Sequence, residues 1–411
     1  MTTPLRRPLA VTAALGVAAL ALAGCVAKSD AAASGSLNVT ATDDGCEVSA
    51  ASVKSGTLAF AVSNTGSEIS EFYLLASDGL RIVGEVENIA PGASRTLTVV
   101  AQPGDYITLC KPGMVGDGVG RASFTVTGDA VQVSGDDAEQ KKQAVTLYSA
   151  FVKDQVEHLV PAVAEFTAAY ASGQDDTARA LFTQVRAYYE RIEPVAESLG
   201  DLDPKIDFRE VDAVADGMEW TGFHRIEKDL WVPAQGALNA DGVTPAWQDW
   251  APSTPEQRQA HAAQLVSDIG ALNDYVHSDD FQTALDDQGI AGISNGAISL
   301  LDEVATGKIS GEEDWWSGTD LSDFAANVEG SKMAYSLVRD LAAASGDQGK
   351  TLVAEIDKGY AGLEAQLATY GSLSGGFVNY AQVTEADKRT LTDLINTLAE
   401  PLSKLTSTVL S

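Results

Sequence analysis

The hydrophobic pattern of this 411-residue chain changes its period once, between Gly128 and Glu139. Before that segment, apolar residues come in short and often alternating runs rich in Val, Thr and aromatic residues, which is typical of β-strands. After it they recur at helical spacing over long stretches. Such a chain is expected to form a β domain followed by an all-α domain.

Residues 37–128 alternate between strand-like runs and turn signals. Pro-Gly pairs beginning at Pro91, Pro103 and Pro112 separate several of these runs. Short strands with regular turns predict a β-sandwich, with strands at 37–42, 57–62, 71–75, 95–100, 106–109 and 122–126. The polar residues 129–139 predict a linker.

Residues 140–411 predict a helical bundle. The apolar spacing indicates long helices joined by short loops, an arrangement that favours antiparallel packing. The expected helices cover 141–170, 176–199, 255–277, 292–306, 320–344, 350–370 and 385–409.

The first 25 residues predict export and a lipid anchor. Arg6 and Arg7 precede an apolar stretch, 9–22, and this order is typical of a signal peptide. The ending Leu-Ala-Gly-Cys25 resembles the bacterial lipobox, which implies that Cys25 becomes the lipidated first residue. Residues 26–36 predict a flexible tether. The mature chain is then attached to the outer face of the cell membrane, and the twin arginines leave the export route open.

The charge of the chain excludes one class of partner. Lys and Arg number 27 against 58 for Asp and Glu, giving a formal charge of -31. So acidic a chain repels phosphate backbones, and therefore no nucleic-acid partner is expected. Cations suit this surface, although solubility alone also favours acidic exported proteins.

One helical stretch carries a metal-ligand pattern. His224 and Glu227 are three positions apart and so share one face of a helix, where imidazole and carboxylate can converge on one ion. The pattern is weak alone, but further acidic groups surround it in the sequence. They are Glu190, Glu193 and Glu197; Glu312, Glu313 and Asp314; Asp320 and Asp323; and Glu329.

Four sequence blocks resemble the EfeO iron-uptake proteins of the imelysin superfamily. They are 189–197 (YERIEPVAE), 222–228 (GFHRIEK), 308–314 (KISGEED) and 324–331 (FAANVEGS), in the family's order. Segments around Cys46, 85–92 and 103–110 resemble the cupredoxin-like domain that precedes the helical domain in full-length members. The resemblance therefore covers nearly the whole mature chain.

The resemblance implies an extracytoplasmic protein that binds ferric or ferrous iron. It further implies delivery of the iron to an EfeU-type membrane permease, with an EfeB-type haem peroxidase alongside. The implied ligands are, in descending order, His224, Glu227, Glu193, Glu190, Glu329, Asp320 and Glu312. Carboxylates suit ferric iron, whereas imidazole suits ferrous iron and zinc. Tyr189 and Arg186 are expected to orient the carboxylates.

The β domain lacks the residues of a blue-copper site. Such a site needs two histidines and a cysteine, and the histidines of this chain are His158, His224, His261 and His277. Two readings of Cys46 and Cys110 stay open. They form a disulfide, as oxidising surroundings favour, or they bind copper, zinc or iron with nearby groups such as Glu71 and Glu87.

Two other functions compete with metal capture. The His-x-x-Glu pattern faintly resembles zinc-protease motifs, but a zinc peptidase normally needs three protein ligands and a general base, and the chain has no His-Glu-x-x-His. Binding of an acidic polysaccharide is the other alternative. It is suggested by the tryptophans Trp231, Trp247, Trp250, Trp315 and Trp316, although such residues more often pack at helix ends. We expect no enzyme.

Overall fold

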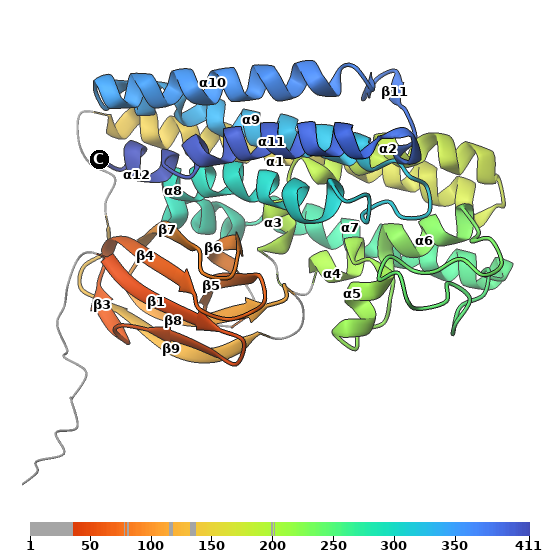
Figure 1. The fold of residues 1–411 in the computed structure, drawn as a ribbon, viewed down its shortest axis with the longest axis horizontal. Coiled ribbons are helices and arrows are strands. Elements are labelled where there is room, and N and C mark those ends of the chain that lie inside the picture. Colours follow the sequence, from red (N-terminus) through yellow and green to blue (C-terminus); the bar gives the residue numbers. More distant parts are fainter. Residues whose placement is uncertain are drawn as a thin grey trace, which may run out of the picture.

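A computed structural model describes residues 36–411, except 78, 80, 81, 115–117, 132–136, 199 and 201. A β-sandwich at the N-terminal end packs beside a larger helical domain (Figure 1). The predicted fold class is therefore confirmed. The predicted signal peptide, Cys25 and nearly all of the predicted tether lie outside the described residues.

The sandwich consists of a four-stranded sheet, β2-β1-β4-β7, and a five-stranded sheet, β3-β9-β8-β5-β6. The rings of Phe72 and Phe124 lie 5.2 and 5.6 Å from the ring of Phe60 and fill the space between the sheets. The strands are β1 Ser36–Thr42, β2 Gly45–Val48, β3 Ser52–Lys54, β4 Gly56–Asn64, β5 Ser70–Ala76, β6 Ile82–Ile89, β7 Ser94–Ala101, β8 Gly104–Pro112 and β9 Val119–Thr127.

All six predicted strands are confirmed, but β2, β3 and β6 were not predicted. The first two are very short. β6 contains Gly84, Glu85 and Glu87, and both Gly and Glu are depleted in strands.

The helical domain is built on the long helix α1, which packs against α2, α7 and α8. Helix α9 packs between α8 and α10, and α10 packs on α11. The larger elements are α1 Ala138–Ala171, α2 Asp175–Glu190, α7 Pro255–Val276, α8 Asp279–Glu303, α9 Asp320–Ala344, α10 Asp347–Leu367 and α11 Glu385–Leu402. The shorter ones are α3 Glu193–Glu197, α4 Leu202–Asp207, α5 Glu210–Ala215, α6 Gly222–Leu230, the π-helical turn η1 Val304–Lys308, β10 Gly371–Ser372, β11 Gly376–Phe377, η2 Tyr380–Gln382 and α12 Leu405–Val409.

Three predicted helices have different boundaries in the structure. The expected helix 385–409 is divided into α11 and α12. The expected helix 176–199 breaks after Glu190 and restarts at Glu193, where Pro194 occupies the first turn of α3 and needs no backbone donor. Helix α8 begins at Asp279 instead of Gly292. Gly289, with a φ of 57°, divides α8 into two helical runs, and the predicted helix corresponds to the second run.

Helix α8 joins the two domains. It packs on β6 and β7 of the sandwich. Arg95 Nη1 lies 3.0 Å from Asp302 Oδ2 across this contact, and the Asn295 amide donates to the Thr98 carbonyl at 2.8 Å. The edge of the sandwich is thereby held against the bundle.

Candidate metal centre

The candidate centre is built around α6, whose residues are all buried. The helix lies this deep because Gly222, with a φ of 81°, packs directly on α4. A Cβ at Gly222 would lie 2.1 Å from the Ile206 carbonyl oxygen. This close contact brings Asp207, the last residue of α4, beside His224 of α6.

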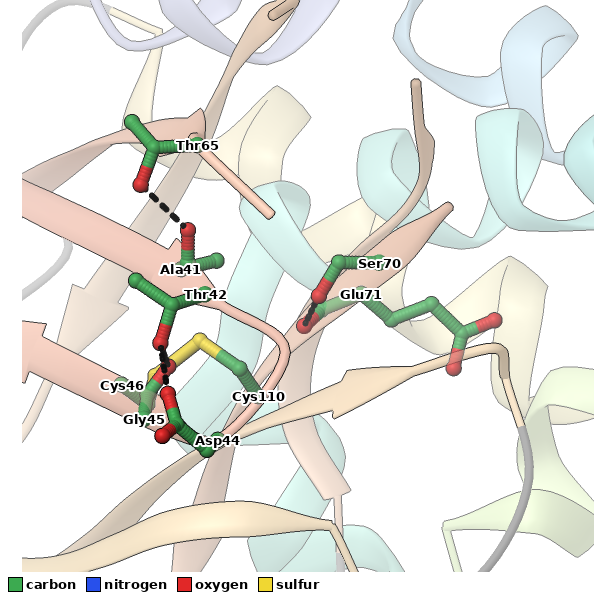
Figure 2. Close-up of a disulfide and its surroundings, with 9 residues drawn as sticks. All are labelled: Ala41, Thr42, Asp44, Gly45, Cys46, Thr65, Ser70, Glu71 and Cys110. Carbon is green, nitrogen blue, oxygen red and sulfur yellow. Dashed lines mark hydrogen bonds between the residues drawn. A yellow bond between two sulfur atoms is a disulfide. The ribbon is translucent and has the colours of Figure 1, made fainter. Parts of the chain in front are cut away.

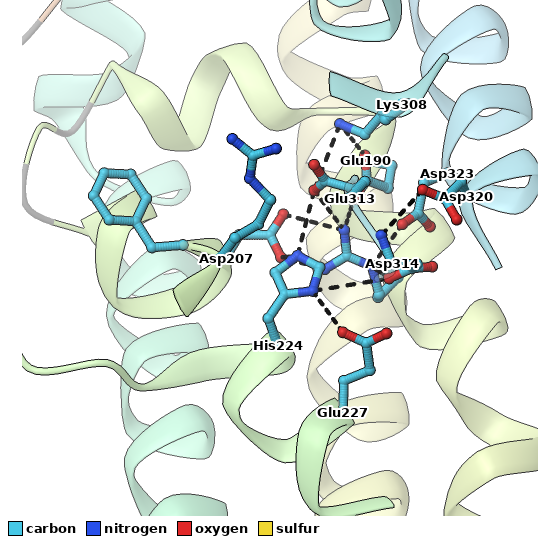
Figure 3. Close-up of polar contacts among 12 residues, drawn as sticks. Glu190, Asp207, His224, Glu227, Lys308, Glu313, Asp314, Asp320 and Asp323 are labelled. Atoms are coloured by element: carbon cyan, nitrogen blue, oxygen red, sulfur yellow. Dashed lines mark hydrogen bonds and ion pairs between the residues drawn. The ribbon is translucent and has the colours of Figure 1, made fainter. Parts of the chain in front are cut away.

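His224 lies among carboxylates from two other segments and its own helix (Figure 3). Its Nδ1 is 3.1 Å from Glu227 Oε2 and 3.8 Å from Asp314 Oδ1. Its Nε2 is 3.3 Å from Glu313 Oε1 and 3.5 Å from Asp207 Oδ1. Two overlapping groups of possible metal ligands result, one made of Asp207, His224 and Glu313 and the other of His224, Glu227 and Asp314.

Glu227 is held in place by the loop before α9. Its Oε1 accepts backbone N–H donors from Trp316 at 3.0 Å and Ser317 at 2.7 Å. Its other oxygen faces His224. A carboxylate fixed in this way presents one oxygen to the centre without a further loss of side-chain freedom.

Two buried cations lie beside these carboxylates. Arg186 of α2 pairs with Asp207, with Glu190 at 2.5 Å and with Asp323 at 2.8 Å. Lys308 of η1 lies 3.0 Å from Glu190 Oε2. Both side chains are almost completely buried.

The buried carboxylates outnumber these cations. Besides those named, Glu193, Asp203 and Asp320 lie in the same region. Oxygen atoms of Asp314, Asp320 and Asp323 are buried without any hydrogen-bond donor. Buried anionic oxygens are costly unless they are paired, protonated or bound to a cation.

The pKa values of these groups follow from the crowding. Burial, followed by the charge of Asp207, raises the pKa of Asp203 to about 7. Burial also raises the pKa of Asp320 to about 7, with Glu227 and Glu313 contributing.

The pKa of the imidazole is raised as well. Burial and Arg186 oppose its charged form, but the hydrogen bonds with Glu227 and Glu313 outweigh them and raise the pKa of His224 to about 10. Near neutral pH, protons on His224 and on some of the carboxyl groups therefore offset part of the negative charge of the centre in the metal-free protein. A metal ion would displace such protons.

The structure brings together most of the predicted ligand residues. Glu190 and Glu193 lie in a buried group with Asp207, and Asp320 lies behind the loop that carries Asp314. Tyr189 and Arg186 orient carboxylates as expected, since the Tyr189 hydroxyl donates to Asp203 at 2.5 Å.

Two predicted ligands lie apart from the carboxylates that contact His224. Glu329 has a side chain that is 52% exposed and pairs with Arg191, because it lies on another side of α9 from Asp320 and Asp323. Glu312 is 44% exposed and lies 3.9 Å from Arg209, whereas its neighbour Glu313 turns inward to His224.

Sequence reasoning missed Asp207 entirely and did not select Glu313, Asp314 or Asp323. The last three stand in acidic runs, where charge alone does not show which side chain turns inward. Asp207 lies in a short helix without a long apolar period, so no sequence signal placed it beside His224.

Cys46 of β2 and Cys110 of β8 form a disulfide that joins the two sheets (Figure 2). This is the first of the two readings left open. A disulfide sulfur is a poor ligand, so the cysteines do not form a metal site in this state. Glu71 points away from the disulfide (Figure 2) and accepts a hydrogen bond from Tyr73 at 2.7 Å.

Glu71 and Glu87 instead line a cavity of about 370 Å³ between the domains. The same cavity is lined by Asp207 and Glu313, so it reaches the candidate centre. Its other acidic lining residues are Glu193, Asp203, Asp212, Asp216, Glu303 and Glu312, with Lys111 and Arg209 as the cations. This wall is strongly negative, and a concave negative surface concentrates cations.

The tryptophans near the centre pack on a buried lysine. Lys228 Nζ lies 4.7 Å from the Trp316 ring and 4.9 Å from the Trp250 ring, while Trp315 is 39% exposed. Much of the aromatic surface is thus used in packing, which removes most of the basis for a polysaccharide platform.

Comparisons with known proteins agree with this arrangement. Residues 144–405 match the family model described as imelysin, and residues 13–119 match the one described as a cupredoxin-like domain. The iron uptake system component EfeO of Escherichia coli strain 536 is 35% identical over 396 residues, covering 95% of this chain and 96% of that protein. The proteins of the same name from Escherichia coli strain K12 and Shigella flexneri are each 35% identical over 373 residues, covering 90% of both chains.

Proposed function

The chain belongs to the imelysin family and carries a cupredoxin-like domain before its imelysin domain, and from that premise we propose that it binds iron outside the cytoplasm for uptake into the cell. The observation that carries the proposal is a buried cluster around His224 in which carboxylates outnumber cations. The printed name of the relatives, iron uptake system component, supports iron as the cargo.

The ligands that we propose are His224 and Glu227 with Asp207, Glu313 and Asp314. Each of the four carboxylates has an oxygen within hydrogen-bonding or ion-pairing distance of a ring nitrogen of His224. Carboxylate oxygens are hard donors that suit ferric iron, and the imidazole also suits ferrous iron. An arriving ion replaces protons on His224 and on neighbouring carboxyl groups, so capture is coupled to proton release.

The acidic cavity between the domains gives the ion a path to this centre. Its lining includes β-domain residues such as Glu71 as well as Asp207 and Glu313, which lie beside His224. A cation drawn into the cavity therefore meets a mostly acidic wall that includes two of the carboxylates beside His224. The β domain contributes one wall of this path.

The place of the protein in the cell is part of the proposal. The lipobox-like ending at Cys25 supports a lipid anchor on the outer face of the membrane. Within the described part of the chain, no helix is long and apolar enough to cross a membrane. The protein is proposed to pass iron to an EfeU-type permease, with an EfeB-type haem peroxidase as a further partner.

The proposal is one of binding and transfer without hydrolysis. A zinc peptidase keeps an open position for water and a general base beside it. Here Glu227, the acidic residue of the motif, accepts two backbone donors and faces the imidazole. Its oxygens are thus committed to holding the centre.

Titration of the metal-free protein with ferrous iron under anaerobic conditions, and with ferric citrate, tests the proposal. We expect one iron per chain and a release of protons into the buffer, read by calorimetry in two buffers of different ionisation enthalpy. If neither ferrous nor ferric iron binds, the proposed function is overturned.

A further inference from the structure

Lys308 ends the π-helical turn η1 and places a buried ammonium beside the carboxylates of the centre. Its Nζ lies 3.0 Å from Glu190 Oε2 and 4.0 Å from Glu313 Oε1 (Figure 3). The same atom lies 3.1 Å from Glu193 Oε2. Single π turns inside helical elements are often found at functional sites. The turn therefore places a compact positive charge among these carboxylates.

The carboxylates around this ammonium could hold a metal ion themselves. Glu190, Glu193 and Asp207 are all buried and offer oxygens within 4.8 Å of one another. The group shares Asp207 with one of the groups that contain His224. The buried cluster therefore has two adjoining halves, one group of possible ligands at His224 and one at Lys308.

The second half is organised independently of Lys308. The Asn327 amide donates to Glu190 Oε2 at 3.1 Å and to Glu193 Oε2 at 3.0 Å. Both carboxylates are thus held by α9 as well as by the lysine. Removal of the ammonium would leave these oxygens close together, with Arg186 as the cation that still pairs with Glu190 and without the cation that pairs with Glu193.

We propose that Lys308 is a built-in substitute for a second metal ion and limits the centre to one exchangeable ion. The inference rests on the proposed function and assigns Glu190 and Glu193 to the lysine instead of to the cargo. An ammonium is a compact point charge with three donors, which suits a pocket of several carboxylate oxygens. Because it is covalently attached, it neutralises the pocket and cannot leave.

The arrangement has a consequence for transport. When two metal ions share a carboxylate, they lie about 3.5–4 Å apart and form the kind of pair that many hydrolytic enzymes use. With Lys308 in place of one ion, the protein keeps a single cargo ion beside His224. A carrier that gives up one ion needs no such paired centre.

The test compares metal stoichiometry in the wild type and in Lys308→Met, with Lys308→Gln in parallel as a second charge-neutral variant. Each metal-free protein is titrated anaerobically with Fe²⁺ and separately with Mn²⁺, and bound metal is counted after desalting. We expect one ion in the wild type and two in both neutral variants. Mn²⁺ spectra from electron paramagnetic resonance should show spin coupling in the variants alone.

Two matched controls place the extra ion. Lys308→Arg retains the charge and should bind one ion. The double variant Lys308→Met with Glu193→Gln lacks one of the ligands of the second half and should return to one. Two ions in this double variant would put the extra ion elsewhere and overturn the inference.

The failures of the two proposals are distinguishable. A wild type that binds no metal contradicts the proposed function. A wild type with one ion, together with folded neutral variants that also bind one, contradicts only the role of Lys308. Should neither neutral variant fold, Glu193→Gln in the otherwise unchanged chain decides: iron affinity within about threefold of the wild type supports the pairing with Lys308, and a loss of about 30-fold or more would make Glu193 a cargo ligand instead.

Discussion

The two domains both bury carboxylates, but they use them differently. In the helical domain, acidic side chains from several separate segments converge on His224, and their charge exceeds that of Arg186 and Lys308. In the β domain there is no histidine, the cysteines are joined to each other, and Glu71 and Glu87 face the cavity between the domains. This difference is the basis for our proposal that the helical domain holds the ion and the β domain guides it.

The difference also shows what the cupredoxin-like fold supplies in this chain. The sandwich is closed by the Cys46–Cys110 disulfide, which takes away the thiolate that a copper site would need. Burial raises the pKa of Glu71 to about 7, partly offset by Lys111, and burial together with Glu71 raises the pKa of Glu85 to about 8. These glutamates are therefore groups whose charge responds to a nearby cation.

Removal of the imidazole should have the largest effect on binding. We expect His224→Ala to weaken iron affinity by about 100-fold or more, since loss of even a residue that only orients a ligand typically costs 10–100-fold. His158→Ala is the matched control, because His158 is exposed on α1. Equal affinities of the two variants would break the assignment of the ion to the helical domain.

The next largest effect should come from the carboxylates that only the structure identifies. Asp207→Asn and Glu313→Gln each remove a group close to Nε2 of His224, and each should weaken iron binding by about tenfold or more. Glu329→Gln is the control and should leave affinity unchanged, since Glu329 is exposed and pairs with Arg191. Titration calorimetry of the three variants gives the comparison, and a larger loss in Glu329→Gln would contradict it.

Iron affinity should fall as the solution becomes more acidic. His224, with a pKa of about 10, and Asp320, with a pKa of about 7, are protonated more fully as the pH falls, and the ion must displace those protons. Each displaced proton changes affinity by about tenfold per pH unit. Affinity measured from pH 8 to pH 5 checks this, and a constant value over that range would show that no proton is displaced.

The metal-free protein should lose stability as the pH rises from 5 to 9. The folded-state pKa values of Asp203 and Asp320 exceed the ordinary carboxyl value, so their ionisation in the folded protein is unfavourable and costs stability at higher pH. The stabilisation from charged His224 is fully present below pH 6.5 and is lost as the pH approaches 10. Thermal unfolding of the metal-free protein across this range measures the trend, and a midpoint that rises with pH would contradict it.

The guiding role of the β domain should appear in the rate of association. The double variant Glu71→Gln with Glu87→Gln should slow iron association by several-fold and reduce its dependence on salt, because the cavity wall becomes less negative. The dissociation rate should change less. Glu68→Gln is the control, since Glu68 lies outside the cavity lining. Stopped-flow measurement at two ionic strengths decides, and equal rates in all three proteins would remove the guiding role.

Loss of the disulfide should have the smallest effect on iron. Cys46→Ser with Cys110→Ser opens a link between residues 64 positions apart and should destabilise the sandwich by about 2–4 kcal/mol. Iron affinity should stay within about twofold, because the cysteines are not ligands. Denaturant unfolding and iron titration of the same variant check both statements. A large loss of iron binding in a folded variant would return the cysteines to the metal site.

Much of the architecture follows from local patterns in the sequence. Alternating apolar residues and turn pairs predict six of the strands, those with clear β-branched runs. Helical spacing predicts α1, α9 and α10 nearly to their ends. The His224–Glu227 face also follows from spacing alone, because residues three apart on a helix must share a side.

The rest of the centre depends on tertiary contacts that spacing does not encode. Asp207 reaches His224 because Gly222 lets α6 lie against α4, and Glu313 turns inward while Glu312 does not. Glu329 lies apart from His224, because its position on α9 leaves it exposed and paired with Arg191. The family resemblance supplied candidate residues, and only the packing of separate segments selects among them.

Anomalous diffraction from iron-loaded crystals, recorded at the iron absorption edge, tests the central claim most directly. We predict one iron peak within bonding distance, about 2.0–2.2 Å, of His224 and of carboxylate oxygens from among Glu227, Asp207, Glu313 and Asp314. A peak beside Glu71 and Glu85 of the β domain, with none at His224, would contradict the account.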